Sequence, residues 1–524
     1  MKKIFLKVSM LVYLFGAGIT VFAQDVDKAV LNWYNTKTPG MNTEAAYKMV
    51  KKQTPKTVVV GVIDSGVDIE HEDLKGQIWV NEDEIPGNGI DDDKNGYIDD
   101  VHGWNFLGTS NNENLEYVRI YKNGKARFDG KTAEEISAAD KADFALWEEC
   151  RDKLQIESIE AKQELEGIQM LQEQLLPMLP TLVKGALGKE SYTEKDLLKW
   201  KPKDDNAKQI RGLALMVETG QLSKERLDEG VKQYQDRLAY HLNPDFNGRT
   251  PVGDNPDDFS QVRYGNNDVE GADALHGTHV SGIIGAVRGN GIGGDGVAAP
   301  VRIMSLRAVP NGDEYDKDIA LAIRYAVDNG ASVINMSFGK SYSPHQKEVY
   351  DAMKYAEEKG VLLVHAAGND AANLDKDPNF PAVRYAFQTE DLKNLLTIGA
   401  STRDAKGHLA ASFSNYGSGS VDVFAPGFEI YNTVPDNKYR ELEGTSMAAP
   451  MVSGVAAFLK AYFPDLSMFE IRDIILKSAT PMGTTQQTLP GTDEQVLFSQ
   501  MSRSGSVVNL QNAVKMAQAM SVSK

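Results

Sequence analysis

Short apolar runs and longer periodic stretches alternate along the chain, and each pattern predicts its own kind of element. Three near-continuous apolar runs occur, at Thr57–Ile63, Val333–Met336 and Val361–Ala367. Such runs predict strands buried on both faces of a parallel sheet. Small and apolar residues at helical spacing predict helices over Gly277–Val287 and Met447–Tyr462. The pattern therefore indicates an α/β fold with a mostly parallel sheet.

The segment between about Leu107 and Gly271 has a different, mainly helical pattern. Ala133–Leu176 contains little Pro or Gly and carries an amphipathic stripe. The stripe residues are Leu154, Ala161, Leu165, Ile168, Leu171 and Leu175. Further helices are expected at Thr193–Leu198, Asn206–Glu218 and Lys224–Leu242, before a polar loop over Asn243–Asp273. Residues 107–271 thus predict a helical insertion, which is either a surface hairpin or a lid, docking arm or dimer contact.

The N-terminus has the pattern of a secretory signal. Three lysines precede an apolar stretch from Val8 to Phe22, and Val21-Phe22-Ala23 forms a small-x-small-like cleavage site. This pattern predicts a signal peptide over residues 1–23, cleaved near Ala23, and a secreted or periplasmic protein. No later segment approaches 18 uninterrupted apolar residues, so no membrane span is expected in the mature chain.

Charge and cysteine content narrow the possible partners. The formal net charge is −18, which argues against nonspecific binding of nucleic acid and suits an exterior rich in ions and calcium. Cys150 is the single cysteine, so an intrachain disulfide is excluded. Rigidity in an exported protein of this kind has to come from another source.

Three polar residues stand in Gly-rich junctions at the ends of the predicted elements. Asp64 follows the first apolar run in VVVGVIDSGVD, His276 opens HGTHVSGIIG, and Ser446 lies in GTSMAAP. A serine hydroxyl becomes a good nucleophile when an imidazole takes its proton and a carboxylate holds that imidazole. Ser446 opens an apolar helix, and Pro450 suits the first turn of that helix. The three residues therefore predict a nucleophilic triad in the order Asp, His, Ser.

With these motifs, the chain resembles the subtilisin-like serine proteases. The resemblance implies a three-layer α/β/α core formed by residues 24–106 and 272–524, interrupted by the insertion. It implies that Asn369, after the third apolar run, donates to the oxyanion together with the Ser446 backbone N–H. It also implies that the substrate is bound by residues after two strands, namely Ser337, Phe338, Gly339 and Gly368. His279 is expected to be a supporting core residue rather than a metal ligand.

An acidic loop between Asn88 and His102, NGIDDDKNGYIDDVH, has the spacing of a calcium loop. Carboxylate, amide and carbonyl oxygens alternate in it, with Gly96 at the sixth position, and hard oxygen ligands suit Ca²⁺. The expected ligands are Asp91, Asp93, Asn95, the carbonyl of Tyr97, and Asp99 or Asp100. His102 replaces the bidentate Glu of an EF-hand, so the loop is not a full EF-hand. Asn290–Gly296 resembles a second calcium loop, for which the sequence does not give the distal ligands.

The sequence as a whole favours an exported serine endopeptidase that acts on protein or peptide substrates through an acyl-enzyme on Ser446 and carries structural calcium. An inactive protease-like protein that binds partners through the insertion is the alternative. A third hypothesis is a calcium-dependent structural protein, which only the acidic loop supports. Cleavage specificity, the natural substrate and the oligomeric state are left open.

Overall fold

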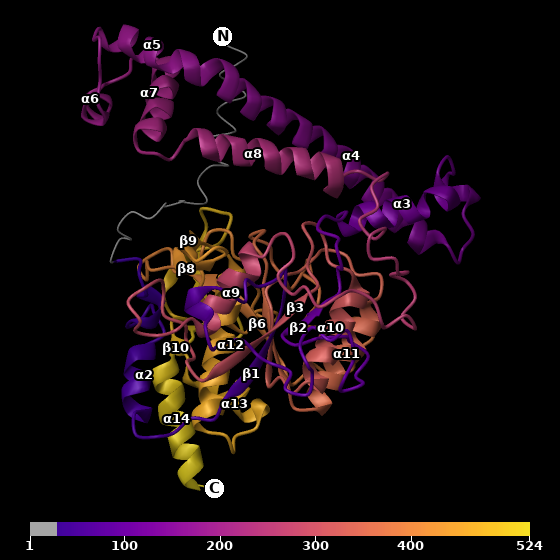
Figure 1. Ribbon diagram of the computed structural model, residues 1–524. Coiled ribbons are helices and arrows are strands. Elements are labelled where there is room, and N and C mark those ends of the chain that lie inside the picture. The colour runs from indigo at the N-terminus through magenta and orange to yellow at the C-terminus, as the bar shows by residue number, and fades with distance from the viewer. Residues whose placement is uncertain (1–28, 524) are drawn as a thin grey trace. The chain divides into compact units, whose positions relative to one another are not determined.

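The computed structural model describes residues 29–523, so the predicted signal peptide lies outside the described residues. The chain divides into two compact units. One consists of Tyr117–Asn247 and is called the helical arm below; the other, called the sheet unit, contains the flanking described residues (Figure 1).

A nine-stranded sheet forms the centre of the sheet unit. Its order is β10-β13-β7-β6-β5-β4-β1-β3-β2, and every neighbouring pair is parallel except β10 and β13. The strands are β1 (Val58–Asp64), β2 (Gly103–Asn105), β3 (Val301–Arg307), β4 (Val333–Met336), β5 (Leu362–Ala366), β6 (Leu395–Ser401), β7 (Val423–Pro426), β10 (Thr480–Pro481) and β13 (Ser506–Val507). Two hairpins lie outside this sheet: β8 (Ile430–Val434) with β9 (Lys438–Leu442), and β11 (Gln486–Thr488) with β12 (Gln495–Leu497). The predicted α/β fold with a mostly parallel sheet is confirmed.

Helices cover both faces of the sheet and make three layers. On one face, β-strand side chains share a hydrophobic core with five helices. These are α2 (Thr43–Val50), α9 (Leu275–Gly285), α12 (Thr445–Tyr462), α13 (Met468–Ser478) and α14 (Leu510–Ser523). On the other face, α10 (Asp316–Asp328) and α11 (Gln346–Glu358) pack on a second core. Since parallel strands bury both faces, their near-continuous apolar composition follows from this arrangement.

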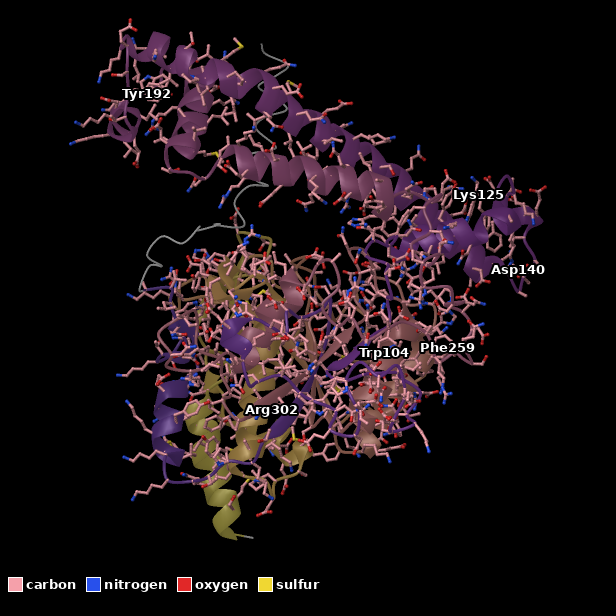
Figure 2. The ribbon with its side chains drawn as sticks, in the orientation of Figure 1. Trp104, Lys125, Asp140, Tyr192, Phe259 and Arg302 are labelled. Atoms are coloured by element: carbon pink, nitrogen blue, oxygen red, sulfur yellow. The ribbon has the colours of Figure 1, made fainter. Side chains whose placement is uncertain are left out.

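The helical arm consists of α3 (Glu116–Phe128), α4 (Lys141–Met170), α5 (Leu176–Leu187), α6 (Glu194–Lys199), α7 (Asp205–Glu218) and α8 (Lys224–Asp236), with π-helical turns after α4 and α8. Helices α4 and α8 lie side by side (Figure 1). The predicted stripe faces the interior of the arm, where Ile168, Leu171 and Leu175 belong to its core. Figure 2 labels Lys125, Asp140 and Tyr192 in the arm, and Trp104, Phe259 and Arg302 in the sheet unit.

The two chain segments that flank the arm in sequence lie together within the sheet unit. A Cβ on Gly248 would lie 2.2 Å from the carbonyl oxygen of Asn112, so these two segments are in contact. The Ser110 hydroxyl also donates to the Gly248 carbonyl (2.7 Å). The residues that precede and follow the arm therefore meet at one place on the sheet unit. The arm, Tyr117–Asn247, is shorter than the 107–271 segment that was expected to be inserted.

Candidate active site

Three adjacent strands bring the predicted site residues to one edge of the sheet. β1 ends at Asp64, β4 ends just before Ser337, and β5 ends two residues before Gly368. β1 pairs with β4 and β4 with β5, all in parallel. The carboxyl ends of neighbouring parallel strands form the usual ligand crevice of an open α/β sheet.

Asp64 and His276 form a close, directed pair. Asp64 Oδ1 lies 2.7 Å from His276 Nδ1 and also accepts the Ser65 N–H (2.8 Å). Asp64 is buried, whereas the His276 side chain is 36% exposed. Burial lowers the pKa of His276, but the charge and hydrogen bond of Asp64 outweigh it, and the pKa lies above its ordinary value. The carboxylate therefore fixes the imidazole and favours its protonated form.

Ser446 is the second residue of α12, which begins at Thr445. Its hydroxyl donates to the Ser337 carbonyl (3.2 Å) rather than to His276. Rotation about the Cα–Cβ bond can redirect the hydroxyl, and catalytic hydrogen bonds are often loose without substrate. The helix begins two residues earlier than expected, so the placement of Pro450 in the first turn was wrong: it is the sixth helical residue.

Pro450 has a consequence for the nucleophile. Because proline has no N–H, the carbonyl four residues earlier, that of Ser446, loses its helical hydrogen-bond donor. The Ser337 hydroxyl replaces that donor at 2.9 Å. Ser337 in turn accepts from Asn335 Nδ2 (2.9 Å), whose Oδ1 accepts the Ser453 hydroxyl (2.9 Å). A buried polar network thus fixes the first turn of α12 against the end of β4.

Asn369 is held with its amide N–H₂ available. Its Oδ1 accepts both the backbone N–H (2.9 Å) and the hydroxyl (3.0 Å) of Thr445. A Cβ built on Gly444 would lie 3.4 Å from Asn369 Nδ2 and 3.6 Å from the Ser446 nitrogen. Two nitrogen atoms that carry N–H groups therefore border the same small space beside Gly444.

A cleft of about 380 Å³ adjoins the Asp64–His276 pair. Ser337, Phe338 and Gly339 form part of its wall, as the resemblance implied, and Arg307 and Asn111 also line it. No motif or spacing in the sequence pointed to those last two residues. Gly368, like Asn369 and Ser446, is not among the residues that line this cleft, and its N–H donates to the Thr445 hydroxyl (3.0 Å).

The two neighbouring core histidines have structural contacts. His279 Nε2 lies 3.0 Å from the Ile430 carbonyl and 3.1 Å from that of Arg440, and burial lowers its pKa to about 3. His365 Nε2 lies 2.8 Å from the Phe338 carbonyl, and burial lowers its pKa to about 4. Both side chains stay neutral near pH 7 and hold backbone segments of the site.

The acidic loop brings several carboxylates close together, but only some of the expected calcium ligands are among them. Oxygens of Glu84, Asp93 and Asp100 lie within 4.8 Å of one another. Asp91 Oδ1 is buried with no hydrogen-bond partner among the described residues, whereas both oxygens of Asp99 accept backbone N–H groups. Hard carboxylate oxygens at this density, with one buried oxygen uncompensated, fit a Ca²⁺ ion.

The other expected ligands have loop-forming contacts. Asn95 donates to Asp93 Oδ2 (3.0 Å) and Asp100 Oδ2 (2.9 Å), and its Oδ1 accepts the Tyr97 N–H (2.8 Å). Glu84 was missed because it precedes the loop in a polar segment without ligand spacing. In the second candidate loop, Asn290 donates to Asp73 Oδ1 (2.6 Å), and burial raises the pKa of Asp73 to about 6.

Comparison with known proteins finds similar sequences and structures. Residues 183–500 match the model of the subtilase family, a range that contains His276, Asn369 and Ser446. A thermophilic serine proteinase of Bacillus sp. (strain AK1) is 37% identical over 47% of this chain and 55% of its own length. Subtilisin Savinase of Lederbergia lenta is 37% identical over 40% of this chain and 72% of its own. A chain in a solved structure of the subtilase cytotoxin SubAB assembly has 24% identity and a TM-score of 0.40, covering 47% of this chain and 77% of that one.

The chain belongs to the subtilase family, the subtilisin-like serine proteases. Its membership confirms the recognition made from the three motifs. The chain spans about half the length of several of the curated relatives it matches. In the part of the chain that the structure describes, no helix is long and apolar enough to cross a membrane.

Proposed function

We propose that this chain is an exported endopeptidase that hydrolyses peptide bonds through an acyl-enzyme on Ser446. The observation that carries the proposal is the convergence of three strand and helix ends. Asp64 Oδ1 lies 2.7 Å from His276 Nδ1, and Asn369 Nδ2 and the Ser446 nitrogen border the space beside Gly444.

In this mechanism Ser446 Oγ attacks the scissile carbonyl carbon while His276 Nε2 takes its proton. Asp64 holds the tautomer with Nδ1 protonated and stabilises the imidazolium. The carbonyl oxygen becomes an oxyanion that accepts from Asn369 Nδ2 and the Ser446 N–H. His276 then protonates the leaving amine, and a water activated by the same imidazole hydrolyses the ester and restores Ser446.

We also propose a structural calcium site at the acidic loop, with Glu84, Asp93 and Asp100 as the central carboxylates and Asp91 beside them. Bound Ca²⁺ would neutralise these charges and rigidify the loop. The predicted signal peptide supports export. The arm is proposed as a separate domain inserted into the peptidase domain, and its role in substrate choice is open.

The test of the proposed function is Ser446→Ala together with fluorophosphonate labelling. The wild type should hydrolyse peptides and carry the label on Ser446, and the variant should lose both while its melting temperature changes little. Ser418→Ala is the control, because Ser418 is exposed and its hydroxyl donates to Asp375 Oδ2 (3.4 Å), outside the proposed site. Failure of the wild type to react would favour the alternative of an inactive binding protein.

A further inference from the structure

Arg307, the last residue of β3, is a buried cation whose donors are all used. It is 2% exposed. Its Nε donates to the Ser65 carbonyl (3.0 Å). Nη1 donates to Asn105 Oδ1 (3.1 Å) and the Gly108 carbonyl (3.3 Å), and Nη2 to the Ser110 carbonyl (2.9 Å) and Asn111 Oδ1 (2.6 Å). Five acceptors thus match the five N–H groups of a guanidinium.

None of these acceptors is a carboxylate, and within residues 29–523 no salt bridge involves Arg307. The charges of Asp268 and Asp273 favour the cation without a direct ion pair, but burial outweighs them, and the pKa of Arg307 lies below its ordinary value. Burying a cation with no directly paired carboxylate is costly. The packing around it is also specific. A Cβ on Gly271, which has φ +67°, would lie 2.1 Å from Arg307 Nε, so only glycine fits there. Because the buried Arg307 guanidinium costs free energy and Gly271 leaves room for it, we infer that Arg307 has a function other than stabilising the fold.

The guanidinium lies against the turn that carries the catalytic carboxylate. Asp64 and Arg307 are register partners in the β1–β3 ladder. The next two backbone N–H groups, of Ala308 and Val309, donate to the Asp64 carbonyl (3.0 and 3.1 Å). Arg307 itself holds the following carbonyl, that of Ser65. Ser65, whose N–H donates to Asp64 Oδ1, is therefore held from the β3 side at both of its peptide groups: the Asp64–Ser65 peptide by Ala308 and Val309, and the Ser65–Gly66 peptide by Arg307.

The Asp64 carboxylate has few other restraints. Its Oδ1 binds Ser65 N–H and His276, while Oδ2 is buried without a hydrogen-bond partner among the described residues. Its orientation thus depends on the Ser65 turn. Through Asn111, which lines the cleft beside it, the same guanidinium also holds the cleft wall.

We propose that Arg307 is the positioning residue of the catalytic pair: by fixing the Ser65 turn, it keeps the Asp64 carboxylate directed at His276 Nδ1. This inference rests on the proposed function for its kinetic consequence. The geometric part, the orientation of Asp64 toward His276, does not depend on turnover.

The kinetic test compares Arg307→Gln and Arg307→Lys with wild type, and divides rates by the fraction of sites that react with fluorophosphonate. Per active site, kcat should fall about ten- to a hundredfold in Arg307→Gln, with KM changed less than threefold. Arg307→Lys, which keeps the charge without the planar fork, should fall less. In the Asp64→Asn background, Arg307→Gln should lower kcat less than twofold further, because the residue acts through Asp64.

Two other arginines provide matched controls. Arg249 is equally buried but bonds Asp254 and Asp318 away from the catalytic pair. Arg302, labelled in Figure 2, lies on the same strand and donates to its neighbour's carbonyl. Arg249→Lys should lower the melting temperature, and both Arg249→Lys and Arg302→Gln should keep the wild-type kcat per active site. If Arg307→Gln and Arg307→Lys lower the melting temperature but keep the wild-type kcat per active site, as expected of Arg249→Lys, Arg307 contributes only to stability and the proposal is overturned.

A readout without turnover separates this proposal from the proposed function. In Ser446→Ala protein, the proton shared by His276 Nδ1 and Asp64 should give a downfield NMR resonance. Adding Arg307→Gln, or Arg307→Lys if the former does not fold, should shift or abolish that resonance, whereas Arg249→Lys should not. An inactive wild type with this shift would refute the proposed function alone, and an unchanged resonance would refute the role of Arg307.

Discussion

Replacement of Gly444 by alanine is expected to disable the chemistry with little effect on the fold. Gly444 has φ +151° and precedes the helix that carries Ser446. The added methyl would stand 3.4 Å from Asn369 Nδ2 and 3.6 Å from the Ser446 nitrogen, which is ordinary van der Waals contact. No atom has to move to admit it, but it occupies the space that both donors share.

The size of the loss follows from what an oxyanion requires. It has to approach each donor to about 2.7–3.1 Å, and a methyl carbon between them competes for that position. Removing one such donor from a subtilisin, a relative of this chain, costs about 10²–10³ in kcat. Impairing both should cost at least that much in kcat, with KM little changed, since the ground-state carbonyl depends less on the hole. The unfavourable backbone conformation of Gly444 (φ 151°, ψ 162°) should add about 1–3 kcal/mol of destabilisation.

The assay is kcat and KM on a chromogenic peptide, with thermal unfolding alongside. Gly360→Ala is the matched control: that glycine has φ +73°, and its Cβ would meet nothing within 4 Å. It should show a similar loss of stability and the wild-type kcat. A Gly444→Ala enzyme whose kcat stays within threefold of wild type would refute the assignment of this space to the oxyanion.

Three further expectations concern calcium, pH and the arm. A chelator should lower the melting temperature of the wild type. The free energy of unfolding should fall by about 2.7 kcal/mol if calcium was present at a hundred times its Kd. Glu84→Gln with Asp93→Asn should be less stable in calcium and indifferent to the chelator; sensitivity equal to wild type would contradict the site. The reaction needs neutral His276, and the pKa of His276 is raised above its ordinary value of 6.5. Activity is therefore lost as the pH falls through that raised pKa, and the acid limb of kcat/KM should have its midpoint above pH 6.5. A midpoint well below 6.5 would contradict the effect of the carboxylate. Replacing Tyr117–Asn247 by a short Gly/Ser linker should preserve small-peptide hydrolysis. A longer deletion that includes Arg249 should not fold, because it breaks the buried ion pair of Arg249 with Asp318. If the shorter deletion is insoluble, the arm belongs to the folding unit.

The main features of the fold could be read from the sequence because local composition determines them. Near-continuous apolar runs such as Val58–Ile63 suit strands buried on both faces, and the triad residues follow directly in short motifs. The start of α12 was misjudged because Gly444 and Thr445 are poor helix formers whose place is decided by contacts with Asn369. Helix ends depend on such caps more than on periodicity.

The remaining site residues depend on contacts between distant segments. Glu84 joins Asp93 and Asp100 only when the polar loop folds back, and nothing in its own neighbourhood indicates a ligand. Arg307 is a single basic residue at a strand end, and its five acceptors come from segments about 200 or more positions earlier. Such residues become visible when buried donors and acceptors are accounted for in three dimensions.

The contact between Asn112 and Gly248 also affects how the chain can fold. β1 and β3, which pair directly, are separated by roughly 235 residues, and the entropy of closing a loop grows with the logarithm of its length. Helices with local contacts form quickly, so an arm that forms early holds its own ends together and removes roughly 130 residues from that loop. The effective separation is then about halved, which lowers the closure cost by about 0.6 kcal/mol. The long insertion between the catalytic aspartate and histidine therefore adds little entropic burden to the sheet on which both depend.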